Sequence, residues 1–308
     1  MSSENAFSKY KALIFDCYGT LIVSTSSPVL TFTSQGALLQ DWETGIYDHL
    51  RPLFQKSGNP SDKVTVIKAY SSVEHDLEAR FPTMRYTDLL AKVYGTVEAR
   101  LQNRETPPDA LRDDLSTANP VVASAHSSSG MQQVASASVG TSAHAQSDSP
   151  GPAEAFARSV PTWQPFPDTV AALASLSKHF KLIILSNIDR DTIAKTRRLL
   201  EGPDPARPLF TFDAVYTAEE VGAYKPAPEM LTYALKHLEE DFGIQQDEVL
   251  MTAQSMPHDI IPAKARGLDT AWINRPNAVT GMGLDGSDAK YVFATLGEMA
   301  EAVEQGRA

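Results

Sequence analysis

Five short apolar segments, separated by stretches of helical periodicity, constrain the fold of this chain more than any other feature. The segments have the length of β-strands and occupy residues 10–16, 181–186, 212–217, 248–253 and 270–273. Helical patterns follow them over residues 169–180, 189–200, 228–242, 260–266 and 295–305, and Asp168 is placed to cap the first. Strands that are apolar along most of their length and alternate with helices predict a parallel sheet covered on both faces. We therefore expect an α/β fold with a Rossmann-like parallel sheet.

Residues 41–104 differ from the rest because they contain helical patterns only. Three helices are expected, over residues 42–56, 61–80 and 86–102. A helical block inserted after the first strand predicts a cap over the sheet edge at which open α/β proteins bind ligands. We accordingly expect a core formed by residues 1–22 and 160–308, with the cap at 41–104.

Two further segments fit neither the core nor the cap. Residues 116–153 contain no Leu, Ile, aromatic residue, Lys or Arg, and we expect residues 105–159 to form a disordered low-complexity linker. Residues 23–40 have weak periodicity, directly follow the first strand and its turn, and begin with Val and end with Gln. Codons for these residues can carry the GT and AG bases that border an intron, so one hypothesis is a translated intron. A genuine hinge loop is equally open, and a full-length message containing these codons excludes the intron.

Charge and cysteine content exclude several classes of protein. The chain has 27 Lys and Arg against 38 Asp and Glu, a net charge of −11, which argues against binding to nucleic acid or an anionic membrane. One cysteine in 308 residues excludes a disulfide framework and Cys-rich metal sites. The polar first residues resemble no secretory signal. We expect a cytoplasmic protein with a small-molecule substrate, and the sequence leaves its oligomeric state open, a homodimer included.

Polar side chains follow four of the expected strands. Asp16 ends the first strand, in the string FDCYGTL, and Ser186 and Asn187 end the second. Lys225 follows the third strand in GAYKPAPE, and Asp259 follows the fourth in MPHDIIPA. Carboxyl ends of parallel strands meet at one edge of a sheet, so these side chains should lie together. A carboxylate there can act as a nucleophile or metal ligand, whereas Asp16 alone could also simply cap its turn.

The order and spacing of these segments resemble the haloacid dehalogenase (HAD) superfamily of hydrolases, over residues 9–22, 41–104 and 160–275. FDCYGTL, DWETGIY, SNIDR, YKP and AQSMPHDIIPAKARGL are similar to the 2-haloacid dehalogenase-like (type II) branch. The resemblance implies cleavage of a carbon–halogen bond in a small 2-haloacid, through an aspartyl ester on Asp16. It also implies that a water oriented by Asp259 hydrolyses the ester. Lys225 would pair with Asp16 and Asp259 and keep both ionised. Thr20, Ser186 and Asn187 would hydrogen-bond the nucleophile or the substrate carboxylate.

Tyr18 stands where phosphatases of this superfamily usually carry an aspartate that protonates the leaving alcohol. A halide needs no proton, whereas loss of a general acid typically slows phosphate-ester hydrolysis by ~10²–10⁴-fold. The resemblance also implies a cap arginine that binds the substrate or the halide, and both Arg80 and Arg85 match it by spacing. Tyr18, Gln254 and His258 are the other residues expected to contact substrate.

The same residues bear on whether the site binds a metal and on which other functions are open. In a phosphatase-like protein, Asp16, the Tyr18 carbonyl and Asp259 would hold Mg²⁺, but Gln254 replaces one of the usual acids. We expect no cofactor at this site. The alternatives are a Mg²⁺-dependent small-molecule phosphatase and a catalytically weak HAD-like binding protein.

Overall fold

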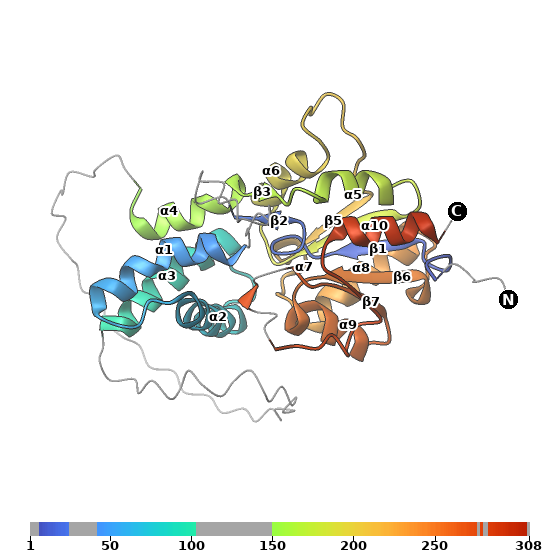
Figure 1. Ribbon diagram of the computed structural model, residues 1–308. Helices are drawn as coiled ribbons and strands as arrows, with labels where there is room; N and C mark the ends of the chain where they lie inside the picture. The colour runs from blue at the N-terminus through green and yellow to red at the C-terminus, as the bar shows by residue number, and fades with distance from the viewer. Residues whose placement is uncertain (1–5, 25–41, 103–149, 276–277, 280–282, 307–308) are drawn as a thin grey trace, which may run out of the picture.

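A computed structural model describes residues 6–24, 42–102, 150–275, 278–279 and 283–306 of the chain (Figure 1). In this part of the chain, six strands pair in parallel in the order β5-β4-β1-β6-β7-β8. Their bounds are Ala12–Phe15 (β1), Lys181–Ser186 (β4), Ala214–Thr217 (β5), Val249–Ala253 (β6), Asp269–Ile273 (β7) and Tyr291–Phe293 (β8). The chain starts at the centre, builds one side and then the other, as in Rossmann folds. The predicted α/β class and the Rossmann-like parallel sheet are confirmed.

Strand β1 lies at the centre of this sheet, between β4 and β6. All four of its residues are buried, which explains why its sequence is apolar without alternation. The order of the strands reverses at β1, and the crevice at such a point is where open α/β sheets bind ligands. Residue 16 therefore follows β1 at the position in the sheet best suited to a binding site.

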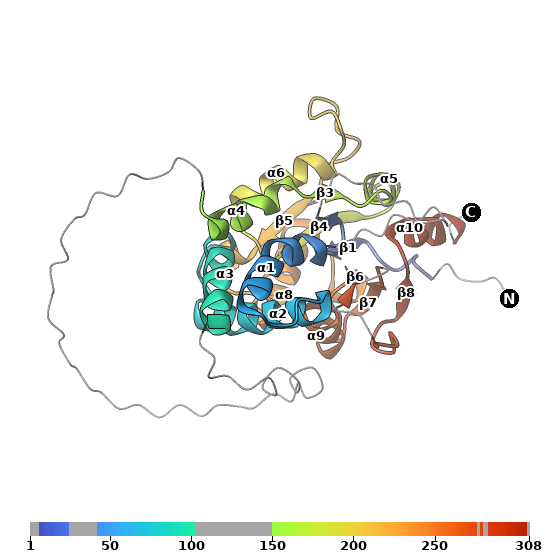
Figure 2. The same ribbon diagram turned by 60° about the vertical axis from the view of Figure 1, so that its left-hand side comes forward.

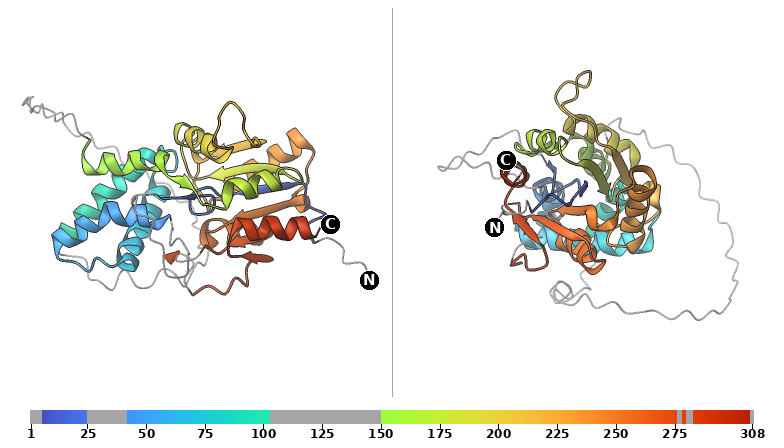
Figure 3. Two further views of the ribbon diagram at one scale, coloured as in Figure 1. Left: turned by 45° about the horizontal axis from the view of Figure 1, so that its top comes forward. Right: turned by 90° about the vertical axis from the view of Figure 1, so that its right-hand side faces the viewer.

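Helices cover both faces of the sheet. Helices α5 (Thr169–Leu176) and α10 (Leu296–Gln305) lie side by side on one face, and α8 (Pro228–Phe242) lies on the other (Figures 1 and 3). The remaining core helices are α6 (Arg190–Leu200), α7 (Ala218–Val221) and α9 (Ile261–Ala265). Asp168 stands at the predicted N-cap position of α5, but its side chain makes no capping hydrogen bond, because the carboxylate accepts from the Arg275 guanidinium and the Gly297 amide instead.

A second group of helices is inserted into the core through a short antiparallel ribbon. Strand β2 (Ile22–Val23) leaves the core and pairs with β3 (Gln164–Pro165), on which the chain returns. Between them, α1 (Glu43–Ser57), α2 (Lys63–Arg80), α3 (Tyr86–Gln102) and α4 (Pro152–Ser159) pack against one another; we call them the α1–α4 bundle. Figure 2 shows the bundle beside the ends of the strands.

Helix α4 corrects one predicted boundary. The predicted linker includes residues 152–159, yet these residues form a helix whose Phe156 is fully buried near Tyr70 and Tyr94. The low-complexity composition concealed a short amphipathic segment at its end. Most of residues 23–40, and residues 105–149 of the predicted linker, lie outside the described residues. Within the described residues, no helix combines the length and apolar character needed to cross a membrane.

Candidate active site

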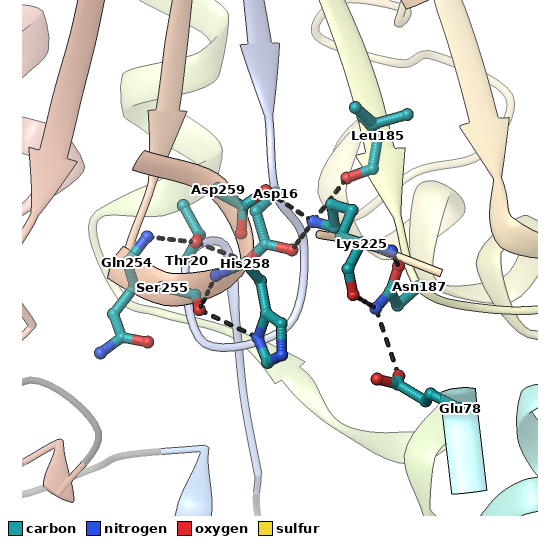
Figure 4. Close-up of polar contacts among 10 residues, drawn as sticks. All are labelled: Asp16, Thr20, Glu78, Leu185, Asn187, Lys225, Gln254, Ser255, His258 and Asp259. Atoms are coloured by element: carbon teal, nitrogen blue, oxygen red, sulfur yellow. Dashed lines mark hydrogen bonds and ion pairs between the residues drawn. The ribbon is translucent and has the colours of Figure 1, made fainter. Parts of the chain in front are cut away.

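Asp16 lies directly after β1, and its carboxylate is held on both sides. Oδ1 accepts a hydrogen bond from Lys225 Nζ at 2.7 Å, and Oδ2 accepts one from Thr20 Oγ1 at 2.8 Å (Figure 4). The turn that brings Thr20 back to Asp16 passes through Gly19 at φ +91°, where a Cβ atom would lie 2.7 Å from the Trp42 ring. The glycine is therefore required both by the backbone conformation and by the close contact with Trp42.

Lys225 joins two carboxylates that are distant in the sequence. Its Nζ donates to Asp16 Oδ1, to Asp259 Oδ1 at 2.8 Å and to the Leu185 carbonyl at 3.0 Å. The side chain is only 4% exposed. Burial alone would lower the pKa of Lys225, but the charges of Asp16 and Asp259 raise it above its ordinary value. Lys225 is thus a fixed cation at the carboxyl ends of β1 and β4.

Asp259 also approaches the Lys225 ammonium, from a π-helical turn formed by Met256–Ile260 after β6. Burial raises the pKa of Asp259 to about 7, and the Asp16 carboxylate adds to this effect while Lys225 opposes it. Among the described residues, its buried Oδ2 atom has no hydrogen-bond partner. A carboxylate with a pKa near neutrality and one open oxygen can accept a proton from water.

Ser186, the last residue of β4, and Asn187, which follows it, have different surroundings. Ser186 is buried, 2% exposed, at the tip of the strand. The Asn187 side chain accepts a hydrogen bond from the Lys225 backbone amide at 2.6 Å and donates to the Lys225 carbonyl at 3.1 Å. Asn187 also donates to Glu78 Oε1 of α2 at 3.2 Å. It therefore fixes the backbone of Lys225 and contacts the α1–α4 bundle, and its amide makes no hydrogen bond to Asp16.

The Thr20 turn is fixed by residues that the sequence analysis did not single out for this role. Thr20 Oγ1 accepts a hydrogen bond from the Gln254 backbone amide at 2.8 Å, so Gln254 acts here through its main chain. The Gln254 carbonyl in turn accepts from Trp272 Nε1. The buried Arg275 guanidinium donates twice to the Thr20 carbonyl, at 2.9 and 3.2 Å. Arg275 follows β7 by two residues, a placement that resembles that of the polar residues after the other strands.

Tyr18, in the turn between Asp16 and Thr20, packs against α6 and Trp163. Its hydroxyl shares a hydrogen bond with Thr196 Oγ1 of α6 at 2.7 Å, and its ring packs edge-on against Trp163. Burial raises the pKa of Tyr18 well above its usual value. Because the hydroxyl is hydrogen-bonded to Thr196 on α6, it is poorly placed to protonate a leaving group at Asp16.

The two candidate arginines lie outside the cluster. Arg80 is exposed at the end of α2. The Arg85 guanidinium, which is 46% exposed, lies 3.0 Å from Asp191 and 3.7 Å from both Asp189 and Glu219. Arg80 therefore faces solvent and Arg85 lies among acidic side chains, and a substrate contact from either arginine stays a prediction.

His258 precedes Asp259 but points toward the bundle (Figure 4). Its Nδ1 lies 3.1 Å from Ser255 Oγ, which also accepts the His258 backbone amide. Burial and the nearby Lys225 charge lower the pKa of His258 to about 4. The imidazole is therefore neutral at pH 7 and is held between the core and α2.

The residues that would hold Mg²⁺ in a phosphatase-like site fit that ion poorly. Asp16 and Asp259 each direct one oxygen at the Lys225 ammonium, which lies between them. Gln254 is neutral, and Asp259 Oδ2 is the sole buried oxygen of this cluster without a partner among the described residues. Mg²⁺ requires near-octahedral oxygen coordination, usually with carboxylates and waters.

Comparison with known proteins assigns the family. The family model described as a haloacid dehalogenase-like hydrolase matches residues 10–267. The chain belongs to this hydrolase family. It is 36% identical over 115 residues to haloacetate dehalogenase H-2 of Moraxella sp. (strain B), which covers 36% of this chain and 46% of the relative. It is 30% identical over 143 residues to glyceraldehyde 3-phosphate phosphatase of Methanocaldococcus jannaschii. This match covers 46% of this chain and 56% of the relative. The chain thus spans about half the length of the curated relatives it matches.

Solved structures extend the similarity in fold over nearly the whole chain. L-2-haloacid dehalogenases are among the structural neighbours. The L-2-haloacid dehalogenase of Xanthobacter autotrophicus, with chloropropionic acid covalently bound, has a TM-score of 0.55 and 16% identity. The match covers 96% of this HAD-like hydrolase and 98% of that chain. At this identity, the comparison establishes the shared fold.

Proposed function

We propose that this HAD-like hydrolase cleaves the carbon–halogen bond of a small 2-haloacid through an ester on Asp16. The observation that carries the proposal is the arrangement at the end of β1, where Asp16 is held by Lys225 and Thr20 with Asp259 beside it. A buried carboxylate that is paired with one lysine and fixed in direction suits attack on carbon.

The first step is displacement at the carbon that bears the halogen. An Asp16 carboxylate oxygen forms a bond to this carbon, and the halide leaves with the bonding electron pair. This step needs no proton donor. The Tyr18 hydroxyl, which is hydrogen-bonded to Thr196, therefore has no proton to supply in it. Lys225 and Thr20 hold Asp16 so that it meets the substrate in one orientation.

The second step is hydrolysis of the Asp16 ester. Asp259 Oδ2 accepts a proton from a water molecule, whose oxygen attacks the carbonyl carbon of the ester. The bond between this carbon and the substrate oxygen breaks as that oxygen takes the proton held by Asp259. A 2-hydroxy acid leaves carrying an oxygen that came from Asp16, and the regenerated Asp16 carboxyl group releases one proton to water. The open Oδ2 atom and the pKa of about 7 support Asp259 as this base.

The α1–α4 bundle acts, in this proposal, as the cap over the site. The Asn187–Glu78 hydrogen bond joins the bundle to the Lys225 loop, and the bundle faces the carboxyl ends of the strands (Figure 2). Enclosure of this kind excludes bulk water from the first step and favours a small substrate.

A metal-dependent phosphatase is the second candidate, favoured by the similarity to the archaeal glyceraldehyde 3-phosphate phosphatase. The position of Tyr18 and the poor fit of Mg²⁺ weigh against it. To separate the two, purified protein is incubated with 2-chloropropionate and with an aryl phosphate, each with and without EDTA. Halide release that is insensitive to EDTA supports the dehalogenase, while EDTA-sensitive phosphate release without halide release would overturn it. No turnover of either substrate would favour a binding protein.

A further inference from the structure

Three potential metal ligands meet where α2 of the bundle faces the core. They are His75 and Glu78 on α2 and His258 on the π-helical turn after β6. A ring nitrogen of each histidine and one carboxylate oxygen of Glu78 all lie within 4.8 Å of one another. Spacing of three residues places His75 and Glu78 on the same face of α2, so both can reach one ion.

Glu78 has unusual surroundings for a carboxylate. It is 5% exposed, and it accepts a hydrogen bond from the neutral Asn187 amide (Figure 4). One turn away, the buried Glu74 carboxylate is occupied by the hydroxyls of Tyr70 at 2.5 Å and Tyr86 at 2.6 Å. In the described part of the chain, no lysine or arginine lies within ion-pair distance of Glu78 or Glu74. A buried carboxylate without a paired cation is costly to keep ionised, and an ion bound at Glu78 would offset that cost.

His258 is already oriented as a ligand would be. The Ser255 hydroxyl lies 3.1 Å from Nδ1, and an outer hydrogen bond of this kind fixes the ring and leaves the other nitrogen free to coordinate. His75 is exposed, which gives an ion a path from solvent. Neither His75 nor Glu78 has a part in the proposed hydrolysis.

We propose that His75, Glu78 and His258 form a binding site for a divalent transition-metal ion of the zinc class. Two imidazole nitrogens and one carboxylate oxygen make up a set that Zn²⁺ takes with a water in the fourth position. The Asp16 carboxylate is not among these three ligands. Because two ligands belong to α2 and one to the core, the ion joins the α1–α4 bundle to the turn that carries Asp259.

The consequence is stabilisation of the bundle against the core. A ligand that binds only the native state raises its stability by mass action. At a Zn²⁺ concentration ~100-fold above its dissociation constant, the midpoint of thermal unfolding should rise by about 5 to 10 °C. Mg²⁺ should not replace Zn²⁺ here, since imidazole is a poor ligand for it.

The test uses the full chain, stripped with EDTA, desalted and titrated with ZnCl₂ by calorimetry and thermal unfolding. Wild type should bind about one ion per chain, and Co²⁺ should give the visible absorption bands of a low-symmetry nitrogen and oxygen site. His75→Ala should lose both the binding and the shift in midpoint. This exposed position can be changed without disturbing the core, which the circular dichroism spectrum of the metal-free variant checks.

His179→Ala is the matched control. It removes one histidine at the other end of the core, where His179 pairs with Glu304, and should bind Zn²⁺ like wild type. The proposal is overturned if wild type binds no Zn²⁺, if His75→Ala binds it as tightly as wild type, or if His179→Ala loses binding to the same extent as His75→Ala.

Discussion

Lys225 Nζ lies 2.7 Å from Asp16 Oδ1, although 209 positions of sequence separate the two residues. The contact joins the loop after α7 to the end of β1, and it is almost entirely buried. The same ammonium lies 2.8 Å from Asp259 Oδ1. One lysine therefore supplies the positive charge next to two buried carboxylates. Its removal should lower both the stability of the fold and the rate of turnover.

Replacing Lys225 with Met should abolish turnover and destabilise the fold by about 3 to 5 kcal/mol, because two buried carboxylates lose their cation. Adding Asp259→Asn should restore part of that stability, since one negative charge is removed. Denaturant unfolding of both single variants and the double variant measures this coupling. The control is Lys264→Met, an exposed lysine paired with Asp288 whose loss should cost no more than ~1 kcal/mol. A Lys225→Met variant as stable as wild type would contradict the account.

Thr20→Val keeps the shape of the side chain but removes its hydroxyl. It should lower kcat by about 10- to 100-fold, because Asp16 Oδ2 loses its donor and the Gln254 amide loses its acceptor. Leaving a buried amide unpaired should also reduce the free energy of unfolding by about 1 to 3 kcal/mol. Thr20→Ser retains the hydroxyl and should keep most of the activity in the same steady-state assay. Equal activity of Thr20→Val and wild type would exclude this role of Thr20.

The pKa of Asp259 predicts the pH dependence of ester hydrolysis. Burial raises this pKa to about 7, so the carboxyl group is protonated below that pH and cannot accept a proton from water. The rate of the second step should rise with pH through 7 and level off above it. Rapid-quench measurement of the decay of the intermediate isolates this step. A rate that stays constant across the range would rule out Asp259 as the base, and Asp259→Asn should remove the pH-dependent component.

Tyr18→Phe tests whether the hydroxyl donates a proton during turnover. We expect kcat within about 3-fold of wild type and a loss of stability of about 1 kcal/mol, because the hydroxyl bonds to Thr196 and not to Asp16. Steady-state halide release measures kcat. A fall of ~10²-fold or more, the range for losing a general acid, would contradict the proposed first step.

The fold and the polar cluster were largely predictable because both depend on short stretches of chain. An apolar strand followed by a polar residue is a local signal, and parallel strands bring such ends together whatever lies between them. For this reason Asp16, Lys225 and Asp259 could be grouped from the sequence before their contacts were seen.

Features that depend on side-chain direction could not be predicted in this way. Spacing alone favoured Arg80 and Arg85 as substrate contacts, but acids on α6 and α7 attract the Arg85 guanidinium. Asp168 follows a proline and matches a helix cap, yet Arg275 offers its carboxylate a charged partner. In each case a partner distant in the sequence determines the orientation, and no local pattern reveals it.

The central claim, that Asp16 forms the ester, is tested most directly by a single turnover in water enriched in ¹⁸O with enzyme in excess over 2-chloropropionate. The account predicts that the heavy oxygen appears in the peptide containing Asp16 and that the first 2-hydroxy acid released is unlabelled. Label in the product of the first turnover, with none in that peptide, would show that water attacks the substrate directly and would contradict the account.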